Sequence, residues 1–194
     1  MTAQRQDTFI YKKEDYDLVA MSKPLSFKPE DYGIIPEGLD TACWAGFWCE
    51  YSISEEGIFL KNFYVNSKDG NYPEINGVTP VKKKLEILYG RYQLYKDVNL
   101  KIPYTGRILI GKDFLREYYI HMGYQRAWAY KVLKELIFQE GILVEEISHS
   151  RKAKELREQI DANPEFMKKL ADNVLEFVDS SFDLSMETKA WWIK

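Results

Sequence analysis

Cysteine is scarce in this chain, with only Cys43 and Cys49 among 194 residues. Two thiols are too few for a disulfide-stapled secreted scaffold or for a zinc site built from cysteine alone. If both lay on one extended strand, their spacing would separate them by about 20 Å, which is beyond disulfide reach. We therefore expect two reduced, buried thiols.

Histidine is equally scarce, with only His121 and His149, and a metal site of histidine and carboxylates needs several converging ligands. The patterns HExxH, CxxC, GxGxxG, GxSxG and the P-loop are all missing. Zinc proteases, dithiol redox proteins, dinucleotide binders, nucleoside triphosphatases and α/β-hydrolases therefore lose their usual sequence support. We expect no metal and no cofactor.

Long apolar runs and excess positive charge are also lacking. No apolar run approaches the ~20 residues that span a bilayer, and the first residues, MTAQRQDTF, lack the pattern of a signal peptide. The formal net charge is -3, whereas duplex nucleic acid is normally bound through a basic patch. The sequence thus predicts a cytoplasmic protein with neither a membrane nor duplex nucleic acid as a partner.

Aromatic residues, by contrast, are abundant, with 14 Tyr, 10 Phe and 5 Trp. Broad rings fit the half-buried, pleated surface of a strand and supply large contact area. A chain of 194 residues with 45% hydrophobic residues can bury one core. We expect a single domain over 1–194, with a β-rich body over 1–148 and a helical portion over 149–194.

Several short runs predict strands, beginning with TFIY and YDLVAMS after residue 7. Two hairpins follow from DTACWAGFWCEYSI, SEEG, IFLKNFYVN and from KELIF, QEG, ILVEEI, with matching EGI tripeptides at their turns. Gly57 and Gly141 would fix these turns. Alternation along the first run places Trp44, Gly46, Trp48 and Glu50 on one face, and Gly46 marks a bulge or the close approach of another backbone.

The stretch from Thr105 to Ser148 contains the densest polar and aromatic chemistry. Within it, GRILIG predicts one strand and KDFLREYYIHMGY a second. Alternation along the second would send Tyr118, Ile120, Met122 and Tyr124 to the core and the residues between them to a more polar face. A helix over 112–140 is the competing interpretation, against which Gly123 argues.

The polar face of that second strand is the candidate site. Tyr119 and His121, with Arg126 and Trp128 nearby in sequence, could bind a small anionic ligand, because arginine supplies a charge-assisted fork, rings stack and histidine titrates near neutrality. The weak catalytic candidates are His121 as a base and Glu117 as the group that orients it. A plain structural role is the alternative. The further candidates for ligand or partner contact are Trp44 and Trp48.

The C-terminal portion changes character. HSRKAKELREQI predicts a charged helix, and Asn163 followed by Pro164 predicts the start of another that would cover a sheet face or edge. Trp191 and Trp192 either pack back onto the body or anchor a partner. Residues 81–97 fit helix and strand equally well.

Two segments resemble a family of uncharacterised bacterial proteins that carry a "STACWRGY"-like and a "YVHMGY"-like segment. The matching residues are Asp40 to Phe47 and Tyr119 to Tyr124, followed by Gly141 to Val144, with Ala45 where the family has arginine. The resemblance covers about the central half of the chain. It implies a compact β-rich bacterial cytoplasmic protein, associated with accessory or immunity-type factors, and it implies no reaction.

Together these observations predict an α+β protein with a mainly antiparallel, curved sheet, of meander or barrel-like form, and a C-terminal helix packed against it. The leading functional hypothesis is a non-enzymatic bacterial interaction module, such as an immunity or defence-related factor that binds another protein. The alternative is a small-ligand or nucleotide binder, in one version hydrolytic, that uses Tyr119, His121 and Arg126.

Overall fold

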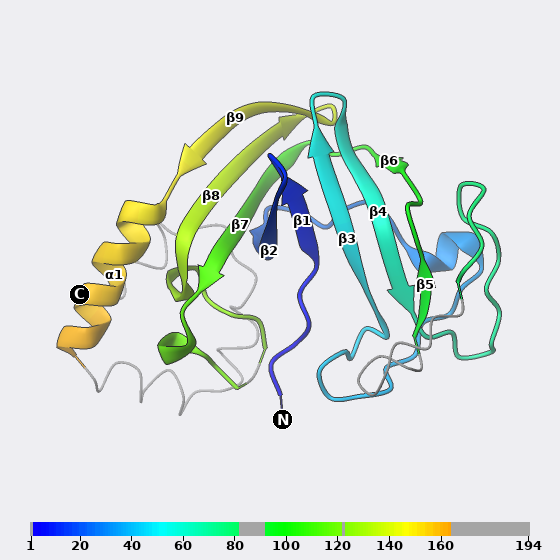
Figure 1. Ribbon diagram of the computed structural model, residues 1–194, viewed down its shortest axis with the longest axis horizontal. Coiled ribbons are helices and arrows are strands. Elements are labelled where there is room, and N and C mark those ends of the chain that lie inside the picture. The colour runs from blue at the N-terminus through cyan, green and yellow to red at the C-terminus, as the bar shows by residue number, and fades with distance from the viewer. Residues whose placement is uncertain (1, 82–91, 122, 164–194) are drawn as a thin grey trace.

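Nine strands and one α-helix form a single mixed sheet with a helix packed on it in the computed structural model, which describes residues 2–81, 92–121 and 123–163 (Figure 1). The strands are β1 Thr8–Tyr11, β2 Glu14–Met21, β3 Phe47–Ser54, β4 Gly57–Val65, β5 Gln93–Tyr95, β6 Leu100–Ile102, β7 Gly106–Phe114, β8 Tyr130–Gln139 and β9 Ile142–Ser148. The helix is α1 Ser150–Ala162, and three short 3-10 helices are η1 Pro29–Tyr32, η2 Arg116–Tyr118 and η3 Ala127–Ala129.

The strand order is β5-β4-β3-β1-β2-β7-β8-β9, and β6 pairs with β4 beside β5. All strand pairs are antiparallel except β1 with β3. Tight turns explain the local pairs: Lys12 and Lys13, between β1 and β2, both have positive φ, as two-residue hairpin turns of the primed type require. The expected α+β fold with a mainly antiparallel sheet and a C-terminal helix is confirmed.

The sheet is strongly curved, and Figure 1 shows it as an arch with β3 and β4 on one side and β7, β8 and β9 on the other. Glu146 of β9 accepts a hydrogen bond of 2.8 Å from the Tyr11 hydroxyl of β1, although three strands separate β1 from β9 in the sheet. At the top of the arch the two hairpin tips meet, since a Cβ on Gly57 would lie 2.8 Å from the Gly141 carbonyl oxygen. The two turns with matching EGI tripeptides thus close one end of the curved sheet.

Each face of the sheet carries its own apolar cluster. The larger one includes Phe9, Leu18, Ile110 and Phe138. The other lies on the opposite face at the β7 and β8 end, where Leu133 packs with the helix residues of α1. These α1 residues are Ala153, Leu156 and Ile160. Between this second cluster and β3, the same face carries polar residues.

The predicted second strand over KDFLREYYIHMGY is wrong, and so is the competing helix over 112–140. β7 continues to Phe114, where the chain leaves the sheet into η2. Gln125 explains how this irregular segment is held, because its side chain bonds both the backbone N–H and the carbonyl of Ile120. A glutamine amide thus replaces ladder bonds, and strand alternation does not assign faces over residues 115–129.

The first hairpin is confirmed, but its first strand begins at Phe47, seven residues later than Asp40. Trp44 therefore lies in a turn and does not share a strand face with Trp48. The expectation that another backbone comes close to Gly46 is confirmed, since a Cβ there would lie 2.5 Å from backbone atoms of Glu37.

Of the segment left undecided between helix and strand, Gln93–Tyr95 is β5 and residues 82–91 lie outside the described residues. The same holds for Met122, the expected helix after Asn163, Trp191 and Trp192. In the part of the chain that is described, no helix is long and apolar enough to cross a membrane.

Candidate functional site

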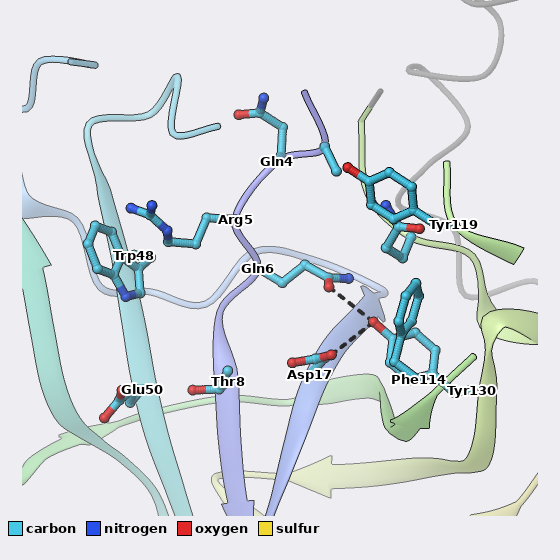
Figure 2. Close-up of a pocket in the computed structure, with 12 residues that line it drawn as sticks. Gln4, Arg5, Gln6, Thr8, Asp17, Trp48, Glu50, Phe114, Tyr119 and Tyr130 are labelled. Atoms are coloured by element: carbon cyan, nitrogen blue, oxygen red, sulfur yellow. Dashed lines mark hydrogen bonds between the residues drawn. The ribbon is translucent and has the colours of Figure 1, made fainter. Parts of the chain in front are cut away.

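A groove with a cavity volume of about 450 Å³ crosses the middle of the sheet on the face that also carries α1 (Figure 2). We call it the central groove. It is lined by Ala3, Gln4, Arg5, Gln6, Thr8, Asp17, Trp48, Glu50, Phe114, Tyr119, Gln125 and Tyr130. Its floor is the sheet itself, and its walls come from segments on either side.

The floor is a row of directly opposed residues on neighbouring strands. Thr8 of β1 pairs with Asp17 of β2 on one side and with Glu50 of β3 on the other. Directly opposed residues point to the same face of a sheet, so the hydroxyl stands between two carboxyl side chains. With strands about 4.8 Å apart, the two acidic residues are about 10 Å apart at Cα. The row continues with Gly111 beyond Asp17 and Asn62 beyond Glu50.

One wall is aromatic and is anchored to the floor at Asp17. The Tyr130 hydroxyl lies 3.1 Å from Asp17 Oδ2 and 3.0 Å from Gln6 Oε1 (Figure 2). Its ring lies over Gly111, where an added Cβ would meet ring carbons at 2.5 Å. Phe114 packs edge-on against Tyr130, at 5.5 Å between ring centroids, and against Tyr119 at 6.4 Å. Because Gly111 has no side chain, the Tyr130 ring can lie against the strand at this point, and this fixes the position of the aromatic wall.

The opposite wall is a stack that contains a cation. Trp48 lies parallel to Tyr64, with ring centroids 4.6 Å apart, and the Arg5 guanidinium lies 4.1 Å from the centre of the Trp48 ring. Below the stack, Glu50 accepts hydrogen bonds from Asn62 and from the Tyr64 hydroxyl, one on each oxygen. Both charged groups of this wall are thus fixed by contacts: the Arg5 guanidinium by the Trp48 ring and the Glu50 carboxylate by its two hydrogen bonds.

The N-terminal segment joins the two walls. Gln4 donates its backbone N–H to the Gly123 carbonyl at 2.8 Å, on the side of the aromatic wall. Its side-chain oxygen accepts from the Trp44 backbone N–H at 3.1 Å on the other side, and the Arg5 N–H reaches the Ala42 carbonyl at 2.7 Å. Residues 3–6 therefore form a strap that sets the distance between the walls.

Charges on the floor and walls favour positive ligands. The lining contains two carboxylates, Asp17 and Glu50, and one guanidinium, Arg5. Burial raises the pKa of Asp17 above its ordinary value, although the Tyr130 hydroxyl lowers it in part. Asp15, two residues along β2 and exposed, projects from the same face as Asp17.

A further carboxyl group lies partly buried next to the groove. Asp7 directly precedes β1, and its Oδ1 accepts a hydrogen bond of 2.7 Å from the Cys49 backbone N–H. Desolvation by the surrounding protein raises the pKa of Asp7 to about 6, and the hydrogen bond from Cys49 offsets only part of this rise. Burial likewise raises the pKa of the Cys49 thiol, and both cysteines are free and buried. The prediction of two reduced, buried thiols is confirmed.

The structure brings two of the predicted site residues, Tyr119 and Trp48, into the central groove. His121 is exposed and stands edge-on to Tyr119, with centroids 5.0 Å apart. Trp44, with 51% exposure, lies at the rim beside Gln4. The predicted residues therefore fall on both sides of the groove mouth.

The remaining predicted residues do not line the groove. Arg126 is buried, with its guanidinium 5.7 Å from the Trp128 ring, so it does not offer an exposed fork to an anion. Glu117 is exposed on η2, and no hydrogen bond between its carboxylate and His121 is found among the described residues. The sequence-based pairing of these two as base and orienting group lacks the geometry it needs.

The sequence interpretation missed the floor: Thr8, Asp17, Glu50 and the Tyr130 that covers Gly111. Alternation did place Glu50 on the same face as Trp48. The sequence does not indicate that Glu50 lies near Asp17. The two are close because β1, which pairs with β2, also pairs in parallel with β3, about 40 residues away in sequence. Among the described residues, no group of three His, Cys, Asp or Glu side chains could hold a metal ion.

No family model, no curated protein and no solved structure matches this chain. The resemblance to a bacterial family with "STACWRGY"-like and "YVHMGY"-like segments therefore stays a prediction.

Proposed function

We propose that this chain is a non-enzymatic binding protein whose central groove receives a compact polar ligand. The observation that carries this proposal is the polar floor of Thr8, Asp17 and Glu50 between two aromatic walls. Ligand sites commonly combine ring surfaces with a few placed polar groups, and a volume of about 450 Å³ suits a small molecule or one side chain.

Binding is favoured over catalysis by how the polar groups are held. Both oxygens of Glu50 already accept hydrogen bonds, and Asp17 is tied to Tyr130. A general base needs a partner that orients it and an accessible site for the reacting atom. His121, at the rim, is exposed and packs edge-on against Tyr119. This arrangement supports recognition, and the described residues that line the groove include no histidine paired with a carboxylate.

The proposal predicts that filling the groove abolishes binding. In Thr8→Phe a ring replaces the hydroxyl at the centre of the floor, where a strand accepts an aromatic residue readily. We expect the ligands that raise the melting temperature of the native protein, in a thermal-shift screen of cationic, neutral and anionic compounds, to lose their effect on this variant.

Thr79→Phe is the matched control, because Thr79 is exposed and lies outside the groove lining. It should respond to ligands as the native protein does. Ligands that stabilise Thr8→Phe as much as the native protein would place the binding site elsewhere and contradict the proposal.

A second candidate function, binding of another protein, is favoured by two exposed rings at the groove mouth. Trp44 is 51% exposed on one side and Tyr119 is 42% exposed on the other. Aromatic side chains of this kind are enriched at interface hot spots. A partner side chain would then fill the groove, so Thr8→Phe would weaken this interaction too. The immunity or defence-related role stays a prediction.

A further inference from the structure

Asp17 has one carboxylate oxygen to offer a ligand. Its Oδ2 receives the Tyr130 hydroxyl at 3.1 Å, while none of the described residues donates a hydrogen bond to Oδ1. Figure 2 shows that second oxygen on the side away from Tyr130, within the groove. The carboxylate is thus already oriented by one partner and has capacity for another.

The rings beside Asp17 suit a positive charge. Phe114, Tyr119 and Tyr130 form an edge-to-face chain, with interplanar angles of 89° for Phe114 with Tyr119 and 63° for Phe114 with Tyr130. Rings in such an arrangement turn their faces in different directions, and a cation is attracted to an aromatic face. A carboxylate next to several rings is the combination that holds ammonium and guanidinium groups.

The opposite wall already holds a cation in this way. The Arg5 guanidinium lies over Trp48 in the same groove, so a positive group of the chain itself already lines this side of the cavity. Asp17, Glu50 and the nearby Asp15 outnumber this charge. An anionic ligand would meet these carboxylates, whereas a second cation would balance them.

We infer that the ligand of the central groove is an organic cation, whose ammonium or guanidinium group binds between Asp17 and the rings of Phe114 and Tyr119, with the buried Tyr130 behind them. This inference rests on the proposed function. It differs from the anionic ligand expected from the sequence, because the arginine on which that expectation depended, Arg126, is buried outside the groove.

The test compares three four-carbon probes by isothermal titration calorimetry at neutral pH: 1,4-diaminobutane, 1,4-butanediol and succinate. Only the diamine should bind well. Asp17→Asn should weaken it about tenfold, because a charge-assisted contact becomes a neutral one. The substituted amide oxygen still accepts from Tyr130, and burial already disfavours the charged carboxylate, so the variant should fold.

Two control variants distinguish the loss of a charge at the site from a general disturbance of the fold. Asp31→Asn makes the same change at an exposed position on η1, outside the groove, and should leave the affinity unchanged. Arg5→Gln removes the competing positive charge, so it should strengthen diamine binding several-fold. Opposite responses of Asp17→Asn and Arg5→Gln are expected of a cation site and not of a loosened fold.

The source of the cation is resolved by a second pair of probes, a short peptide with one lysine and the same peptide with acetyl-lysine. Tighter binding of the lysine peptide than of the diamine, lost on acetylation, assigns the cation to a protein side chain. Tighter binding of the diamine assigns it to a free amine. Either result supports the inference.

Three results would overturn it. Diamine binding that Asp17→Asn leaves intact would show that the carboxylate is not the contact. Succinate or adenosine monophosphate binding better than the diamine, in a way that Thr8→Phe abolishes, would overturn the cation but keep the groove as the site. No binding of any probe at millimolar concentration would overturn the proposed function as well.

Discussion

Three carboxyl side chains on or beside adjacent strands differ in their surroundings. Asp7 is desolvated and accepts from a backbone N–H, Asp17 is partly buried beside Tyr130, and Glu50 has both oxygens occupied by hydrogen bonds. Desolvation favours the neutral acid, whereas donated hydrogen bonds favour the carboxylate. The carboxyl group of Asp7 therefore has a structural role, whereas those of Asp17 and Glu50 form part of the groove floor.

Asp7 should make stability depend on pH. Its pKa is raised from 3.8 to about 6, so the folded state holds a proton that the unfolded chain has released. Stability is then lost as the pH rises from about 4 to about 7, by up to about 3 kcal/mol. Asp7→Asn keeps an acceptor for Cys49 and removes this charge, and urea unfolding should show its stability relative to the native protein improving over that interval.

Asp31→Asn, at an exposed position, is the control and should follow the native protein at every pH. A constant difference between Asp7→Asn and the native protein from pH 4.5 to 7.5 would contradict the prediction, because a packing effect has no such pH dependence.

Single residues were predictable from the sequence only where chemistry and exposure are local properties. Trp48 and Tyr119 were predictable because large rings within a polar segment supply contact area wherever they reach the surface. Arg126 was misplaced because its burial depends on the irregular segment 115–129, which Gln125 holds. Asp17 gave no signal, since an acid in a short alternating strand is usually solvated.

At the scale of elements, β7 and β8 show how one missing side chain shapes a wall. The Tyr130 ring, fully buried, lies over Gly111 on the neighbouring strand. In Gly111→Ala the new methyl group would meet ring carbons at 2.5 to 2.7 Å, so the ring must move away from Asp17. We expect a loss of about 1–3 kcal/mol in the free energy of unfolding, measured by chemical denaturation.

A double-mutant cycle isolates this contact. With Tyr130→Leu in place the ring is gone, so Gly111→Ala should cost clearly less than it does in the native background. Equal costs in the two backgrounds would mean that the strand itself, and not the ring, rejects the alanine.

Elements whose pattern is local were predicted well. The turns at Gly57 and Gly141 and the strands they join follow from alternating runs around glycine. The end of β7 at Phe114 could not be predicted, because residues 115–124 still alternate. In the structure the Leu115 N–H bonds to the Ala129 carbonyl at 2.7 Å, and the Ile120 N–H bonds to the Gln125 side chain.

At the scale of the whole molecule, ion pairs link elements that the sheet order keeps apart. Glu146 of β9 lies 2.5 Å from Lys12 Nζ in the β1–β2 turn and also pairs with Lys134 of β8. Hydrogen bonds from these lysines lower the pKa of Glu146 to about 2. Curvature of the sheet makes this network possible, and the network in turn resists flattening.

The network should contribute to stability above pH 4.5 and be lost as the pH falls towards 2, since a depressed carboxyl pKa means that acid must protonate a paired group. Glu146→Gln should cost about 1 kcal/mol at neutral pH and much less near pH 2, as measured by urea unfolding. Glu145→Gln, at the exposed neighbouring position, should have little effect at either pH. A cost for Glu146→Gln that persists at low pH would point to packing instead of charge.

The row across β1, β2 and β3 also makes the groove a reporter of correct folding. Slipping any of these strands by one residue would turn Thr8, Asp17 or Glu50 to the opposite face. The bulge in β2 falls after Leu18 and leaves Asp17 opposite Thr8. A chain that refolds with a shifted register would regain its secondary structure and look native by circular dichroism, but it would lack the polar floor of the groove. Recovery of ligand binding would therefore distinguish correctly refolded protein from protein with a misaligned sheet.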